Sequence, residues 1–317
     1  MASIVTLTLS PALDCATGIA HLCPDAKLRC SPPSYAPGGG GINVARAIHK
    51  LGGHALALCP IGGPSGQHLL ELLSAEGVAW QALPISAWTR QCINLVALDS
   101  AQQYRLVMPA ACLNTAEQAQ LLQRLSELRS CDYLLISGSM PAGLDADFLP
   151  RLLHCARRLG ARCILDSGAE TLRQGLDCGG LYLIKPNRHE LSSLAGVTSS
   201  EPAQLAEIAR SLLAPGRCEA MLVSLGVEGA LLVTATLSEC IPAPAVPKRS
   251  SVGAGDSLLG AATLQLAAGA SWSTAARYGV AAGSAAIMAE GTDLCSRADT
   301  ERLFAWLQQQ AQARGTS

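Results

Sequence analysis

The sequence predicts an α/β protein with a doubly wound, mostly parallel β-sheet flanked by helices. Aliphatic runs of strand length alternate with segments of helical periodicity along most of the 317 residues, an order typical of βαβ units. Hydrophobic residues make up 49% of the chain but aromatic residues only 3%, so the core is built mainly from aliphatic side chains. No internal repeat or low-complexity linker divides the chain, which predicts a single α/β domain over residues 1–317.

The predicted strands are short aliphatic runs, as expected of strands buried on both faces of a parallel sheet. In chain order they span 4–9, 55–61, 132–137, 162–166, 181–185, 220–224 and 230–234. Between most of them, apolar residues recur at spacings of three and four, which predicts amphipathic helices. The predicted helices span 42–51, 66–76, 115–129, 145–159, 203–213, 256–268, 272–288 and 298–311.

One uncharged stretch, residues 257–276, has about the length of a membrane span. Polar residues such as Thr263 and Gln265 interrupt its apolar run, and Gly269 divides it. Two buried helices joined near Gly269 therefore fit the stretch better than one bilayer helix.

Ligands of doubly wound sheets bind outside the carboxyl ends of the strands. Polar side chains at or just past the end of a predicted strand are therefore expected to border a binding cleft. Four residues meet this description: Asp14, Ser139, Lys185 and Ser224.

Two segments, 15–35 and 89–108, have β-like character but no crossover helix, so they interrupt the alternation. They carry four cations, namely Lys27, Arg29, Arg90 and Arg105. A cation in such a segment is either a solvated surface charge or part of a clamp for an anionic ligand.

Charge and cysteine content exclude several classes of protein. The formal net charge of −1 argues against electrostatic binding of nucleic acid. The 13 cysteines are odd in number, form no CxxC pair and lie mostly in apolar runs, which predicts reduced, buried thiols rather than disulfides or metal ligands. The start of the chain alternates like a strand and lacks the basic residues of a signal peptide. We therefore expect a cytoplasmic protein with neither nucleic acid nor a membrane as a partner.

The most informative stretch is SVGAGDSLLG, residues 251–260. Gly253 and Gly255 permit backbone conformations in which successive N–H groups point inward, and the helix that follows adds its positive end, so the turn suits an anion. Asp256 lies at the start of this helix, where its carboxylate can accept a proton from a substrate hydroxyl. The alternative is that Asp256 only caps its own helix.

A second glycine cluster, PGGGGINVARAIHKLGG at residues 37–53, opens an amphipathic helix and places Asn43 in its first turn. Backbone without side chains suits a polyhydroxylated ligand, because N–H groups can reach its hydroxyls and Asn43 can both donate and accept. The cluster is neither a Walker A loop nor a dinucleotide fingerprint, since no G-K-[ST] follows and the third glycine of GxGxxG is missing.

Six motifs in this order resemble the ribokinase-like carbohydrate kinase family, and within it the phosphofructokinase B branch. They are TLTLSPALD (6–14), PGGGGINVARA (37–47), ISGSMP (136–141), KPNRHE (185–190), VSLGVEGA (223–230) and SVGAGDS (251–257). The resemblance implies an ATP-dependent phosphosugar kinase with a ribokinase-like fold, which converts fructose 6-phosphate to fructose 1,6-bisphosphate. A kinase for fructose 1-phosphate or tagatose 6-phosphate shares most of these motifs, and a sugar-phosphate sensor without catalysis is the alternative of another class.

The resemblance also implies roles for the residues of the sugar half. Asp256 is the general base, and the amides of Gly253, Ala254 and Gly255 form the anion hole. The sugar hydroxyls and the adjoining backbone involve Asp14, Gly38, Gly39, Asn43 and Ser139, and the 6-phosphate is held by Lys27, Arg90 and Arg105. Segments 15–35 and 89–108 form a β-sheet lid that excludes water and pairs with the lid of a second subunit in a homodimer.

The nucleotide half follows from the same resemblance. Nucleotide-binding residues are Lys185, Asn187, Ser224, Leu225, Gly226, Val227, Gly229, Val246, Val280 and Ser284, although Val246 and Val280 equally suit a core position. Glu190 acts on Mg²⁺ through water, since Mg²⁺ bound with ATP keeps several waters. A monovalent-cation loop for K⁺ is formed by Ser250, Val252, Ala286, Ala289, Gly291 and Asp293. One departure from the branch is Cys23, which stands where close relatives place an aromatic residue near an inhibitory nucleotide site, so the resemblance does not decide whether excess ATP inhibits this protein.

Overall fold

A nine-stranded, mostly parallel sheet forms the centre of the computed structural model, which describes residues 2–197, 202–250 and 252–315. Its strand order is β13-β12-β11-β10-β9-β8-β1-β4-β5. The strands are β1 (Ile4–Leu7), β4 (Leu56–Ile61), β5 (Ala79–Pro84), β8 (Tyr133–Ser137), β9 (Arg162–Asp166), β10 (Leu181–Ile184), β11 (Cys218–Ser224), β12 (Ala230–Thr234) and β13 (Ser238–Ile241). The predicted α/β class is thereby confirmed.

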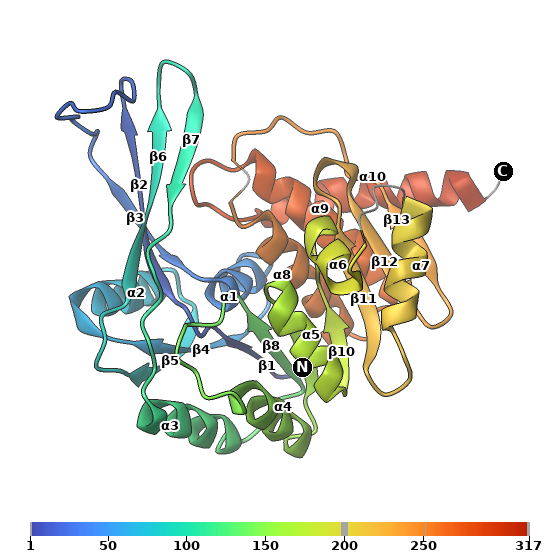
Figure 1. Ribbon diagram of the computed structural model, residues 1–317. Coiled ribbons are helices and arrows are strands. Elements are labelled where there is room, and N and C mark those ends of the chain that lie inside the picture. The colour runs from blue at the N-terminus through green and yellow to red at the C-terminus, as the bar shows by residue number, and fades with distance from the viewer. Residues whose placement is uncertain (1, 198–201, 251, 316–317) are drawn as a thin grey trace.

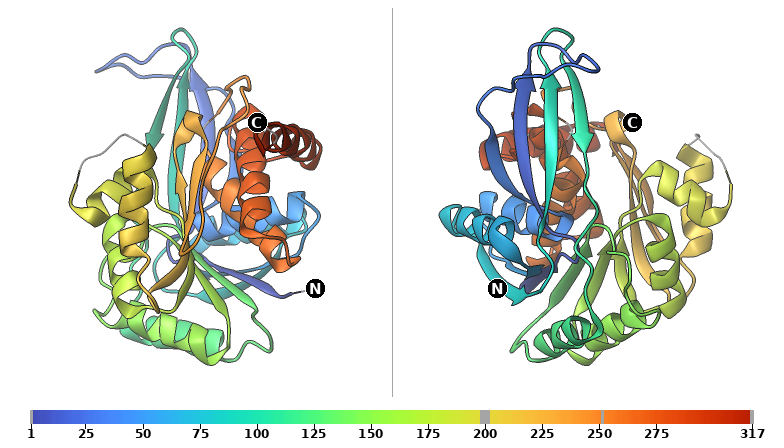
Figure 2. Two further views of the ribbon diagram at one scale, coloured as in Figure 1. Left: turned by 90° about the vertical axis from the view of Figure 1, so that its right-hand side faces the viewer. Right: turned by 60° about the vertical axis from the view of Figure 1, so that its left-hand side comes forward.

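Helices cover both faces of this sheet, and the sheet separates two hydrophobic clusters, one on each face (Figures 1 and 2). One face packs on α1 (Gly40–Lys50), α2 (Gly63–Ala75), α8 (Ala254–Ala267), α9 (Trp272–Met288) and α10 (Arg297–Gly315). The other packs on α3 (Thr115–Ser126), α4 (Phe148–Arg158), α5 (Ala169–Cys178), α6 (Arg188–Ala195) and α7 (Pro202–Leu212). The chain changes face at β1, which pairs with β4 on one side and with β8 on the other, so the doubly wound crevice opens between β1 and β8.

A separate four-stranded sheet, in the order β3-β2-β6-β7, rises from the carboxyl ends of the large sheet (Figure 1). Its strands are β2 (Ala12–Ile19), β3 (Ser34–Gly38), β6 (Arg90–Ala97) and β7 (Gln102–Leu106). The two segments predicted to form a lid contain β6, β7 and most of β2, whereas β3 lies largely beyond residue 35. The boundaries differ, because β2 begins at Ala12 and residues 20–33 form a loop instead of a strand.

Three details of the prediction need correction. The strand expected at 4–9 ends at Leu7, because the chain turns there toward the small sheet. The strand at 230–234 runs antiparallel to its neighbour, since only the short turn with a 3₁₀ helix at Gly226–Glu228 joins it to β11 and a parallel connection needs a long crossover. Strands β5 and β13 were not predicted, because edge strands are only partly buried and carry a weak apolar pattern.

The uncharged stretch forms two buried helices, α8 and α9, with the turn between them at Gly269, as predicted. Among the residues that the structure describes, no helix is both long enough and apolar enough to cross a bilayer. Helix α8 packs closely on α1, since a Cβ atom at Gly260 would lie 3.0 Å from the carbonyl oxygen of Val44. This packing brings the first turns of the two helices to the same place.

Candidate functional site

The first turn of α8 lies where the large sheet, the small sheet and α1 meet (Figure 1). Gly253 precedes the helix with φ of 72°, in the left-handed region, and a Cβ atom there would lie 2.2 Å from Leu294. A glycine is therefore required for α8 to begin at Ala254, and this start places Asp256 in the first turn. Ser251, the first residue of the glycine-rich motif, lies outside the described residues.

Asp256 is partly buried, and its Oδ2 atom accepts a hydrogen bond of 2.9 Å from Nδ2 of Asn43 on α1. Burial, and secondarily the nearby carboxylate of Asp166, raise the pKa of Asp256, while Asn43, Lys185 and Arg105 lower it; the net result is a pKa of about 6. A carboxylate with this pKa is mostly ionised at neutral pH and is a better base than an ordinary aspartate.

Asp166 and Lys185 form a buried ion pair beside Asp256. The Nζ atom of Lys185 lies 3.0 Å from Oδ1 of Asp166, and Ser137 donates to Oδ2 of Asp166 at 3.1 Å. Burial alone would lower the pKa of Lys185, but Asp166 and the other nearby carboxylates raise it, so Lys185 stays charged. A Cβ atom at Gly255 would lie 3.4 Å from Lys185 Nζ, which places the ammonium against the proposed anion hole.

The sequence analysis missed Asp166, and the signal for it was present. Asp166 is the last residue of the predicted strand 162–166, and the rule that selected Lys185 and Ser224 applies to it equally.

Asp14 lies on β2 of the small sheet, and not in a loop after β1 as the predicted strand boundaries suggested. Its carboxylate fills the space in front of Gly38, where a Cβ atom would lie 2.4 Å from Oδ2. Burial raises the pKa of Asp14, whereas Arg105, Arg46 and Arg90 lower it. Arg105 thus acts on both Asp14 and Asp256, and Asn43 and Lys185 lie beside Asp256, so the structure brings these five polar residues together.

The three predicted phosphate-binding cations differ in their surroundings. Arg90 donates to the carbonyl oxygens of Ser10 at 3.0 Å and Met108 at 3.1 Å, and its buried Nε atom has no partner among the described residues. Arg105 is close enough to influence the pKa values of both Asp14 and Asp256. Lys27 is exposed in the loop 20–33, which joins β2 to β3. Ser139 follows β8, is exposed, and accepts a hydrogen bond of 2.7 Å from Ser10 through its carbonyl oxygen.

The N-x-x-E motif has a structural role in this protein. The side chain of Asn187 accepts from the N–H of Glu190 at 2.9 Å, and Oε2 of Glu190 accepts from the N–H of Asn187 at 2.8 Å. This is a capping box at the start of α6, and Asn114 and Glu117 form the same box at the start of α3. Burial raises the pKa of Glu190, partly offset by Lys185.

The predicted nucleotide residues of the segments 185–187 and 224–229 lie side by side. An isolated parallel bridge joins Asn187 to Ser224, and Arg188 and Glu228 form an ion pair of 2.8 Å between the two segments. Val227 is 85% exposed in the second of these segments. Three other predicted nucleotide residues are buried or partly buried: Val280 and Ser284 on α9, and Val246, which packs against the core.

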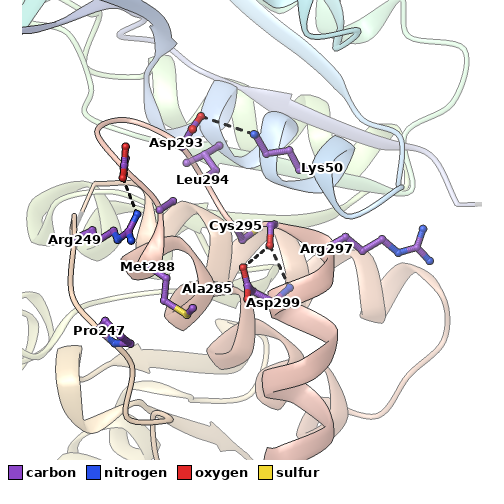
Figure 3. A pocket seen from close by; sticks show the side chains of 13 residues that line it. Lys50, Pro247, Arg249, Ala285, Met288, Asp293, Leu294, Cys295, Arg297 and Asp299 are labelled. Atoms are coloured by element: carbon purple, nitrogen blue, oxygen red, sulfur yellow. Dashed lines mark hydrogen bonds and ion pairs between the residues drawn. The ribbon is translucent and has the colours of Figure 1, made fainter.

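The predicted cation loop borders an open cleft of about 710 Å³ (Figure 3). Ser250 donates to the carbonyl oxygen of Gly291 at 2.7 Å, and this bond joins the two halves of the loop. Figure 3 shows the carboxylate of Asp293 directed toward Lys50, at 3.9 Å, so this side chain is engaged in an ion pair. Ala289 and Asp293 therefore offer the loop only their backbone carbonyls.

Comparison with known proteins gives one consistent picture. The family model described as pfkB family carbohydrate kinase matches residues 13–299. The ATP-dependent 6-phosphofructokinase isozyme 2 of Escherichia coli K12 is 45% identical over 307 residues, which cover 97% of this chain and 99% of that protein. A 1-phosphofructokinase of Xanthomonas campestris is 31% identical over 259 residues, which cover 80% of this chain and 81% of that protein.

Solved structures agree with the sequence comparisons. Crystal structures of Escherichia coli phosphofructokinase-2 with potassium and with fructose-6-phosphate match at TM-scores of 0.94 and 0.92 and at 44% identity, covering 97% of this chain and 100% of that one. The same Escherichia coli protein has also been solved in a tetrameric inhibited form.

The electrostatics of Asp256 predict that Asp256→Asn stabilises the fold at neutral pH. A raised pKa means that the folded state binds the proton more tightly than the unfolded chain, so stability falls as pH rises from about 4 through about 6. Removing the charge should raise the free energy of unfolding by about 1–2 kcal/mol at pH 7.5, and by about half as much at pH 5. Urea denaturation at both pH values measures this difference. The exposed Asp147→Asn should change stability by less than about 0.5 kcal/mol at either pH, and an equal gain at both pH values in Asp256→Asn would contradict the assignment of the raised pKa.

Proposed function

Because the chain belongs to the pfkB family of carbohydrate kinases, we propose that it transfers the γ-phosphoryl group of ATP to the 1-hydroxyl of fructose 6-phosphate. The products are fructose 1,6-bisphosphate and ADP. The observation that carries the proposal is the carboxylate of Asp256, raised in pKa to about 6 and placed at a helix start beside glycine amides. A protein that only senses a sugar phosphate has no use for a base directed at a hydroxyl.

In the proposed reaction, Asp256 takes the proton of the sugar hydroxyl as the phosphoryl group arrives. The amides of residues 253–255 and the start of α8 stabilise the charge on the transferring group. Asp14 and Asn43 hold sugar hydroxyls, and Lys185 lies close enough to neutralise phosphate charge beside Gly255. The small sheet excludes water, which protects the γ-phosphate from hydrolysis.

We infer fructose 6-phosphate rather than fructose 1-phosphate as the substrate, because the chain is more similar in sequence to a 6-phosphofructokinase than to a 1-phosphofructokinase. The chain is 45% identical to a 6-phosphofructokinase and 31% identical to a 1-phosphofructokinase. The buried, unpartnered Nε of Arg90 adds a donor for an anionic substituent of the sugar.

Mg²⁺ is proposed to bind mainly through the phosphates of ATP, where it neutralises their charge. Among the described residues, no three His, Cys, Asp or Glu side chains lie together as a metal-ligand group, so a nucleotide-borne ion fits this chain better than a protein cage. Glu190 is proposed to bind one of its waters through Oε1, since the capping box engages only Oε2. The carbonyl groups at Val252, Ala286, Ala289, Gly291 and Asp293, together with Ser250, are proposed to hold K⁺, as a potassium complex is known for the Escherichia coli relative.

A direct test of the function is a coupled assay of ADP release over four substrates. Fructose 6-phosphate should be the best substrate, ahead of fructose 1-phosphate, tagatose 6-phosphate and unphosphorylated fructose. Asp256→Asn should lower kcat by about 10²–10⁴-fold and leave sugar-phosphate binding largely intact, because loss of a general base affects the transition state. Turnover close to that of the wild type in this variant would refute the role of Asp256.

Glu190→Gln separates the metal role from the capping role. Glutamine keeps an acceptor oxygen for the capping box, so the unfolding midpoint should change little. The Mg²⁺ concentration for half-maximal activity should rise by about 10–100-fold, as for other residues that act on a metal through an outer contact. Glu117→Gln is the matched control, since it alters the same box at α3 and should leave the Mg²⁺ titration unchanged. An unchanged titration in Glu190→Gln would assign the motif to capping alone.

Arg90→Ala tests the phosphate clamp. The substitution should weaken the binding of fructose 6-phosphate by about 2–5 kcal/mol, because a desolvated, charge-assisted contact is lost. The KM for ATP should remain nearly unchanged. Arg29→Ala is the control in the same lid, as Arg29 is exposed in the loop of the small sheet. Equal losses for phosphorylated and unphosphorylated sugars would show that Arg90 holds the lid and not the phosphate.

The small sheet is proposed to join two copies of the chain in a homodimer. Its surface carries exposed apolar side chains, including Tyr35 at 43%, Leu106 at 47% and Val107 at 59% exposure. We propose that Lys27 reaches the phosphate site of the partner subunit. Mixing Lys27→Ala with Asp256→Asn subunits should then restore part of the activity, because one site of each mixed dimer carries neither change. No recovery, in a mixture shown by sedimentation to contain dimers, would place Lys27 at its own site or outside any site.

A further inference from the structure

Arg46 is a buried arginine beside the proposed catalytic base, and the sequence analysis gave it no role. It lies on α1, one turn after Asn43, and is 3% exposed. A guanidinium in this position is always charged, so it must be paired and hydrogen-bonded to be stable there.

Glu76, at the C-terminal end of α2, holds the guanidinium in one orientation. Nε of Arg46 donates to Oε2 at 2.7 Å and Nη2 donates to Oε1 at 2.7 Å, which is a bidentate pair. The remaining nitrogen, Nη1, donates to the carbonyl oxygen of Pro37 at 2.9 Å and to Oδ1 of Asn43 at 3.3 Å.

These contacts decide which way the amide of Asn43 faces. Arginine has donors but no acceptor, so the amide atom next to Nη1 must be the oxygen. The NH₂ group of Asn43 then faces the other way, where Nδ2 lies 2.9 Å from Oδ2 of Asp256. A reversed amide would place NH₂ against the guanidinium and oxygen against the carboxylate, and both contacts would be repulsive.

We propose that Arg46 is a positioning residue for phosphoryl transfer, which holds the amide of Asn43 so that a donor always engages Oδ2 of Asp256. This inference rests on the proposed function and concerns the same site. One oxygen of the base is thereby fixed, and Oδ1, which has no hydrogen-bond partner among the described residues, is the oxygen left for the substrate hydroxyl.

The donor matters because the other groups that face Asp256 act in opposing directions. Asp166 at the end of β9 disfavours the ionised form, while Lys185 after β10 and Arg105 on β7 favour it. Without Arg46, the amide is free to turn and the hydrogen bond from Asn43 is lost for part of the time. The base is then protonated at a higher pH, so activity on the acid side falls first.

The test is the pH profile of kcat/KM for fructose 6-phosphate between pH 5.5 and 9 in Arg46→Met and Arg46→Lys. In Arg46→Met we expect the acid limb to move up by about one pH unit, with about a fivefold loss at pH 6 and a smaller loss at pH 8.5. Arg46→Lys keeps a cation for Glu76 but lacks the planar guanidinium that also reaches Asn43. The acid limb of its pH profile should therefore move in the same direction. This variant decides the matter if Arg46→Met does not fold.

Arg277→Met is the control for loss of a partly buried arginine ion pair. Arg277 on α9 pairs with Glu239 on β13, and its loss should lower stability without moving the acid limb. A purely structural Arg46 would behave like Arg277, with reduced stability or a loss of activity that is uniform in pH. Either result in both Arg46 variants would overturn the proposal.

Asn43→Ala completes the test, because Arg46 is proposed to act through Asn43. Asn43→Ala should move the acid limb by itself, and adding Arg46→Met should move it no further. Additive shifts would mean that Arg46 acts on Asp256 by another route and would refute the proposal. Wild-type protein without kinase activity on any phosphosugar would instead refute the proposed function, so the two failures are distinguishable.

Discussion

The site depends on a carboxylate kept close to a second carboxylate at the start of a helix. Asp256 and Asp166 repel each other, and burial weakens the hydration of both, so this arrangement would be unstable without nearby cations and donors. Lys185 offsets the repulsion by forming an ion pair with Asp166, and Asn43 donates a hydrogen bond to Asp256. The result is a carboxylate with a pKa of about 6, which remains ionised at neutral pH and suits the role of base proposed for it.

The architecture follows from the need to bring these groups together. Asp166 and Lys185 come from adjacent strands of the large sheet, Asp256 from α8, and Asn43 from α1, which packs closely on α8. The small sheet then adds Asp14, Arg90 and Arg105 from the opposite side. The large sheet and its helices thus supply the proposed acid–base groups, while a separate sheet supplies the groups proposed to contact the sugar.

The two N-x-x-E motifs have the same structural role, so the motif alone does not indicate a metal site. Asn114 with Glu117 and Asn187 with Glu190 make the same pair of hydrogen bonds at the starts of α3 and α6. The spacing therefore reports helix capping in both places. Only the surroundings differ, because Glu190 lies near Lys185 and Asp166, whereas Glu117 lies against Ser86.

The sequence by itself determined the fold class, most strands and helices, the two segments of the small sheet and the start of α8. These features are local, since apolar periodicity and the glycine at position 253 act over a few residues. It also indicated Asp256, Asn43 and Lys185, whose motifs are contiguous. Only the tertiary structure decided that Asp14 lies on the small sheet, that β12 is antiparallel, and that Arg46 contacts Asn43 and Asp166 pairs with Lys185. Arg46 is not marked by its neighbours in the chain, and Asp166 is marked only by its place at the end of a predicted strand. Their partners, Glu76 and Lys185, come from other elements and meet them only when the sheet and helices assemble.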